Sequence, residues 1–180
     1  MATAPSAPEF WLRGPIDGVP GELMPAAHAL LQTLEDVEQA VQGLTVDQIW
    51  QTPGGAASIG FHLIHLCGST DRLLTYARGL TLNDVQKAAI GREKNPPPTE
   101  ASPLVEEFRQ TVDAALAQIK STPPSTLADA RAVGRAALPT TVLGLIFHAA
   151  EHSQRHAGQV VTTAKVVRGL PLLQTSEGGT

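Results

Sequence analysis

The sequence predicts an all-α protein, an up-down four-helix bundle with a long crossover between helices 2 and 3. Three observations lead to this prediction. Four long stretches repeat apolar residues every three or four positions, as helices with one buried face do. A proline-rich segment, NPPPTEAS, separates the second stretch from the third. No two segments show the polar–apolar alternation of paired strands, so we expect helices and loops only.

The first helix is expected over Glu22–Gln42. Pro25 lies in its first turn, where a missing N–H does no harm, and Gly43 is a suitable stop. A short helical turn should follow over Thr45–Trp50, with Thr45 as its cap. The apolar face of the first helix consists of Leu23, Ala27, Leu30, Leu34, Val37 and Val41.

The second helix is expected from Ser58, its cap, to Arg78, before Gly79. Prolines cannot continue a helix, so residues 80–101 should form the crossover, with a short helix in LNDVQKAAI. The third helix should begin at Ser102, with Pro103 at its first position, and end at STPPS.

The segment LADARAVGRAALPTT has no clear helical or strand pattern. After it, the fourth and longest helix is expected from Thr140 or Thr141 to about Arg168. We expect residues 1–180 to form a single domain with an ordered core over about residues 20–170 and a frayed polar tail, TSEGGT.

Composition narrows the function classes. The chain has 180 residues, 42% of them hydrophobic, and a formal net charge of −4 without a basic run, so a nucleic-acid partner is not expected. Cys67, the single cysteine, cannot form an internal disulfide, which favours a reducing cytoplasm. No secretory signal or membrane-spanning run is recognisable, so we expect a cytoplasmic protein without a membrane partner.

The fourth helix contains a row of histidines in HAAEHSQRHAGQ. Residues four positions apart lie about 40° apart around a helix, so His148, His152 and His156 share one face, and Gln159 falls on the same arc. Two imidazoles with this spacing can aim their nitrogens at one ion about 2.0–2.1 Å away. The alternative is a polar face without a metal, and spacing alone leaves both interpretations open.

The second helix supplies histidines in GFHLIHL. His62 and His65 both lie within its apolar pattern, and a third ligand for the ion must come from another helix. Several buried imidazoles without a common partner would be costly, and a metal removes that cost. His28 is isolated and is best interpreted as an ordinary core histidine.

Together these segments resemble the DinB-like (DinB/YfiT-like) superfamily of metal-binding four-helix bundles. The resemblance rests on IWQTPGG, on GGAASIGFHLIHLCGSTDRLL and on the ending HSQRHAGQ, and it extends from the first helix to Gly169. It implies a crossover bundle with a metal on His65, His152 and His156. It also implies a close helix approach at Gly158 and a role for Gln159 in hydrogen bonding to a ligand.

Four further residues near this pattern have open roles. His62 could orient a ligand or compete as one, and His148 could be a fourth ligand, a proton shuttle or a pocket-lining residue. His148 and Glu151 are the catalytic candidates. Metalloprotease motifs place the catalytic Glu directly after the first histidine ligand, whereas Glu151 directly precedes His152. Asp71 is expected to have a surface or salt-bridge role.

Three neutral imidazoles form a Lewis-acid site for a divalent metal, with zinc or nickel preferred and iron or cobalt also open. The resemblance implies an S-transferase or isomerase that uses a low-molecular-weight thiol, such as bacillithiol or mycothiol, on a small-molecule substrate. The alternatives are a hydrolase with a metal-bound hydroxide and a non-enzymatic, metal-stabilised stress protein. The resemblance also implies a homodimer.

Overall fold

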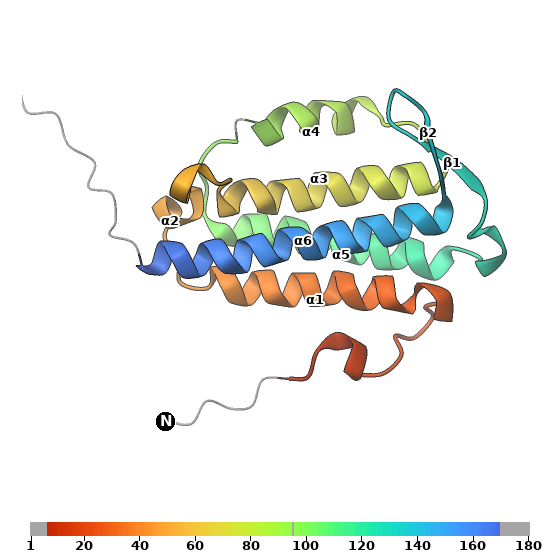
Figure 1. The fold of residues 1–180 in the computed structure, drawn as a ribbon, viewed down its shortest axis with the longest axis horizontal. Coiled ribbons are helices and arrows are strands. Elements are labelled where there is room, and N and C mark those ends of the chain that lie inside the picture. Colours follow the sequence, from red (N-terminus) through yellow and green to blue (C-terminus); the bar gives the residue numbers. More distant parts are fainter. Residues whose placement is uncertain (1–6, 95, 170–180) are drawn as a thin grey trace, which may run out of the picture.

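The computed structural model describes residues 7–94 and 96–169, and its four long helices lie lengthwise against one another (Figure 1). The predicted all-α bundle with a crossover between its second and third long helices is confirmed. The expected tail TSEGGT lies outside the described residues. The long helices are α1 (Met24–Val41), α3 (Ile59–Ala77), α5 (Ala101–Ser121) and α6 (Val142–Gly169).

The core consists of the apolar faces of these four helices. Each helix contributes side chains that are wholly inaccessible to solvent, because a three-and-four spacing places them on one face. Their burial is the main source of stability of the bundle. These side chains include Leu30 and Val37 of α1, Leu63 and Leu66 of α3, Phe108 and Val112 of α5, and Ile146 and Val160 of α6.

Short helical segments connect and flank the long ones. Both predicted caps are present: the Thr45 hydroxyl accepts from the Gln48 N–H at the start of α2 (Val46–Trp50), and the Ser58 hydroxyl accepts from the Phe61 N–H at the start of α3. Single 3-10 turns occur at η1 (Phe10–Leu12), η2 (Gly21–Leu23), η3 (Pro53–Gly55) and η4 (Pro124–Thr126).

The crossover forms the predicted short helix, α4 (Asp84–Lys94), which lies along α3 (Figure 1). After α4, the crossover contacts Trp50, whose indole N–H donates to the Thr99 carbonyl oxygen at 2.8 Å. The Trp50 ring lies so close to Gly60 that an added Cβ there would come within 2.6 Å of it. α5 begins at Ala101, so Pro103 is its third residue and not its first.

The expectation of no paired strands was wrong. The unassigned segment forms an antiparallel hairpin of β1 (Ala130–Val133) and β2 (Leu138–Thr141), in which Val133 faces Leu138. Four-residue strands are too short for a clear alternation of polarity, and Pro139 in β2 is typical of an edge strand. The hairpin contacts the end of α3, where Arg131 donates to the Ala77 carbonyl oxygen.

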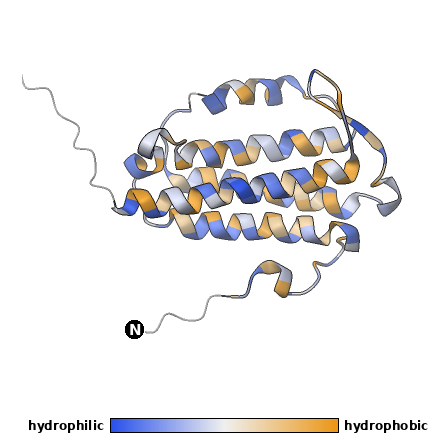
Figure 2. Ribbon diagram, viewed as in Figure 1, coloured by the Kyte–Doolittle hydropathy of each residue, from blue (hydrophilic) through white to orange (hydrophobic). Residues whose placement is uncertain are grey.

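Within residues 7–94 and 96–169, no helix has both the length and the apolar character needed to span a membrane. Hydrophilic residues predominate on α4 and in the middle of the visible face of α6 (Figure 2). That part of α6 contains the histidine segment.

Candidate metal centre

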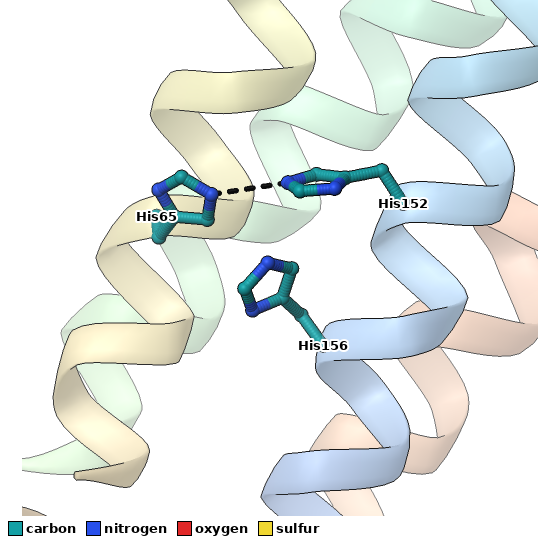
Figure 3. Close-up of side chains that lie close together, drawn as sticks. All are labelled: His65, His152 and His156. Atoms are coloured by element: carbon teal, nitrogen blue, oxygen red, sulfur yellow. Dashed lines mark hydrogen bonds between the residues drawn. The ribbon is translucent and has the colours of Figure 1, made fainter. Parts of the chain in front are cut away.

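Three histidines from two helices meet between α3 and α6 (Figure 3). His65 of α3 and His152 and His156 of α6 each offer one ring nitrogen, and these nitrogens all lie within 4.8 Å of one another. The Nε2 atoms of His65 and His152 are 3.0 Å apart. Two nitrogens bound tetrahedrally to one ion at about 2.0–2.1 Å would be about 3.3 Å apart. A slight opening of the His65 and His152 rings would therefore let these two nitrogens share one metal ion.

The His65 ring is oriented by a carboxylate from the crossover. Its Nδ1 lies 2.9 Å from Oε2 of Glu93, a buried residue of α4. A carboxylate only accepts, so Nδ1 carries the proton and Nε2 presents its lone pair toward the triad. Glu93 also forms an ion pair with Arg72, which lies two turns after His65 on the same face of α3. An added Cβ at Gly68 would overlap this carboxylate, so Gly68 provides the space for it.

The other two triad rings also have neighbours at Nδ1. Nδ1 of His156 lies 2.9 Å from Nδ1 of His62, which is buried on α3. Nδ1 of His152 lies 3.3 Å from the Arg155 guanidinium. Each ring therefore has a polar neighbour at Nδ1. Because a guanidinium can only donate, Nδ1 of His152 accepts from Arg155, and the proton of that neutral ring lies on Nε2, which faces Nε2 of His65. In metal sites, a contact like that of His65 Nδ1 with the Glu93 carboxylate orients the imidazole ligand.

The triad region favours neutral imidazoles. Burial, with a smaller contribution from the neighbouring rings, lowers the pKa of His156 to about 3. Burial and the proximity of His65 lower the pKa of His62 to about 4, and burial also lowers the pKa of His152. Near pH 7 these rings therefore have lone pairs available, which is the form that binds metals.

Comparison with known proteins identifies the family. A sequence profile of the DinB superfamily matches residues 29–160. The chain belongs to the DinB superfamily. Its fold is similar to that of YfiT from Bacillus subtilis, described as a probable metal-dependent hydrolase with an unusual four-helix bundle topology. The two chains share 14% identity over 86% of this chain and 93% of that one, with a TM-score of 0.65. No curated protein matches the chain.

The DinB resemblance pointed to His65, His152 and His156, and the structure brings these three together. His148, one turn before His152 on α6, is about half exposed, and its ring centre lies 5.4 Å from that of His152. Its Nδ1 contacts the Glu151 carboxylate at 2.6 Å. Glu151 also accepts from Arg155 at 2.9 Å, so both catalytic candidates lie at the exposed edge of the triad.

Other residues considered from the sequence lie away from the triad. Gln159 is exposed, and no hydrogen bond from it to the described residues is present. An added Cβ at Gly158 would meet nothing within 4 Å, so the close helix approach expected there does not occur within the described chain. The Asp71 carboxylate accepts from Gln86. Cys67 is buried, and burial raises its pKa to about 12, so the thiol is not a nucleophile of this site.

Sequence reasoning missed Glu93 and Arg72. Arg72 follows His65 by seven residues and therefore shares its face of α3, which was a usable signal. Gln86 and Glu93 are also seven residues apart and are the two buried residues of α4. A polar pair with this spacing on a helix without an apolar stripe indicates that the helix packs through hydrogen bonds. No pattern in the sequence shows which other helix α4 packs against.

Proposed function

We propose that this chain binds one divalent metal on His65, His152 and His156 and activates a small nucleophile there. The observation that supports the proposal is the convergence of three ring nitrogens within 4.8 Å. A bound ion would act as a Lewis acid and lower the pKa of a thiol or water placed beside it. Three neutral nitrogen donors suit zinc or nickel, and they also accept iron or cobalt.

We assign proton transfer to His148 and Glu151. The Glu151 carboxylate accepts from His148 Nδ1, so Nε2 of His148 has a lone pair and can take a proton. His148 lies beside the triad at the exposed edge of α6, where solvent reaches its ring. In this arrangement His148 is the general base, and Glu151 holds its ring and tautomer.

The first candidate reaction is S-transfer or isomerisation with a low-molecular-weight thiol. The thiol proton would pass to His148 while the sulfur attacks an electrophilic carbon of a small substrate; a C–S bond forms and a leaving group such as chloride departs. Activation of the thiol by the metal site makes a carboxylate ligand unnecessary, and the triad contains none. The protein's own Cys67 is buried and cannot substitute for the added thiol.

The second candidate is hydrolysis, in which water replaces the thiol and the same His148 accepts its proton. The fold similarity to YfiT, described as a probable metal-dependent hydrolase, is the observation that favours it. A third candidate is a non-enzymatic protein whose metal only stabilises the bundle. The homodimer implied by the family stays a prediction, with Leu143, Phe147 and Val166 of α6 exposed and available for pairing.

Turnover assays separate these candidates. We would incubate the zinc- or nickel-loaded protein with chlorodinitrobenzene and either bacillithiol or mycothiol, and separately with p-nitrophenyl acetate without thiol. S-transfer predicts thiol-dependent release of chloride, which His148→Ala slows by roughly 100- to 10,000-fold. Ester cleavage without thiol would indicate hydrolysis. Neither reaction, together with a large metal-induced rise in melting temperature, would overturn the catalytic proposal in favour of a structural metal.

A further inference from the structure

α4 docks on the bundle without a buried apolar side chain. Its two buried residues are Gln86 and Glu93, while Val85 and Ile90 are exposed. A helix of this length is only marginally stable alone, so α4 should be ordered largely by its contacts with α3. Each of its two buried residues makes polar contacts with α3.

The first contact lies far from the triad. The Gln86 amide donates to the Asp71 carboxylate and to the Thr75 hydroxyl, both at 2.7 Å. The second contact is Glu93, which forms an ion pair with Arg72 and accepts from His65 Nδ1 at 2.9 Å. One of these two polar contacts between α4 and α3 therefore involves His65, a residue of the triad.

We infer that Glu93 is the positioning residue of the metal centre and that, through it, metal binding and the docking of α4 strengthen each other. The inference rests on the metal site proposed above. An ion on Nε2 of His65 requires the proton on Nδ1, which is the tautomer that donates to Glu93. An ion also polarises the ring and strengthens that hydrogen bond. A docked Glu93 in turn holds the ring with Nε2 toward His152.

Linkage makes the coupling reciprocal. If docked Glu93 raises the affinity for the ion by some factor, the bound ion must favour docked over undocked α4 by the same factor. Outer-sphere partners of metal-bound histidines typically contribute roughly 10- to 100-fold in affinity. We therefore expect α4 to dock more tightly on α3 when the metal is bound.

The test combines zinc titration with hydrogen exchange on the full chain, and neither needs a substrate. In Glu93→Gln we expect zinc affinity to fall roughly 10- to 100-fold. In the parent, saturating zinc should slow exchange of the α4 amides by a comparable factor, and in Glu93→Gln this slowing should be lost. The matched control is Glu100→Gln, the same change at an exposed crossover residue, which should behave as the parent.

Two further measurements separate positioning from a general loss of structure. Gly68→Ala adds a methyl group where the carboxylate lies, and it should reproduce the loss of affinity without changing any charged group. Nitrogen NMR of the metal-free rings should find the His65 proton on Nδ1 in the parent and redistributed toward Nε2 in Glu93→Gln. These results would support the inference.

Equal zinc affinity in the parent and Glu93→Gln would overturn the inference and leave the proposed function intact. Zinc that slows α4 exchange equally in both proteins would overturn it as well. A confirmed coupling in a protein without turnover would overturn the catalytic proposal and leave this inference standing. A parent that does not bind zinc, nickel or another divalent ion would overturn both.

Discussion

α6 and α4 both pack against α3, but by opposite means. α6 contributes wholly buried apolar residues such as Ile146 and Val160, whereas the buried residues of α4 are Gln86 and Glu93. Apolar burial stabilises without regard to direction, while a few hydrogen bonds fix a geometry and contribute little net free energy. The difference separates a rigid bundle from an adjustable crossover, and His65 contacts both regions.

The largest expected difference in the free energy of unfolding is between a substitution in the bundle core and one on the exposed surface of α4. Phe108→Ala removes a fully buried ring of α5 and should lower the free energy of unfolding by about 3–5 kcal/mol. Val85→Ala on exposed α4 should change it by no more than about 0.5 kcal/mol. Urea unfolding of the metal-free protein measures both. A loss below about 1 kcal/mol for Phe108→Ala would show that α5 does not anchor the core.

The α3–α6 interface should also respond to pH, because it contains imidazoles whose pKa is lowered on folding. His62 has a pKa of about 4 and His156 of about 3 in the folded chain, against about 6.5 when unfolded. Below about pH 6.5 the unfolded chain binds more protons, so stability is fully present above that pH and falls progressively toward pH 4.

Melting temperatures of the metal-free protein from pH 7.5 to pH 4.5 measure this effect. His62→Gln should flatten the decline, because one of the two groups is removed. A melting temperature that rises as the pH falls from 6.5 to 5 would contradict the pKa directions that burial imposes.

The smallest global effect is expected at the end of α4 remote from the triad. Gln86→Ala removes the contacts with Asp71 and Thr75 and should lower the free energy of unfolding by no more than about 1 kcal/mol. Exchange of the α4 amides should nevertheless accelerate, because docking loses one of its two attachments. Unchanged exchange in α4, or a cooperative loss of the whole bundle, would remove the distinction between the two regions.

Much of this division could be predicted from the sequence. Apolar spacing gave the four long helices, the caps Thr45 and Ser58 marked two helix starts, and the prolines of NPPPTEAS marked the crossover. The histidine spacing placed His148, His152 and His156 on one face of α6, and the family resemblance selected His152 and His156 among them and His65 over His62. In each case, the signal lay in residues close together along the chain.

The parts that sequence reasoning missed depend on long-range contacts. The strands Ala130–Val133 and Leu138–Thr141 are too short to show an alternation of polarity. The contact of Arg131 with Ala77 joins residues far apart in the sequence and has no local signal. Nothing in the sequence distinguishes Glu93 from the other acidic residues, because its contacts with His65 and Arg72 form only when α4 packs on α3. Gln159, for which the family resemblance implied a hydrogen bond near the metal ligands, is exposed to solvent.

The central claim, that histidines of α3 and α6 hold one ion, is tested most directly by elemental metal analysis of protein purified without a histidine tag. The parent should contain close to one divalent ion per chain, His152→Ala almost none, and His148→Ala, the neighbouring histidine outside the triad, as much as the parent. Equal metal in the parent and His152→Ala, or no metal in a parent supplied with zinc and nickel, would contradict the claim.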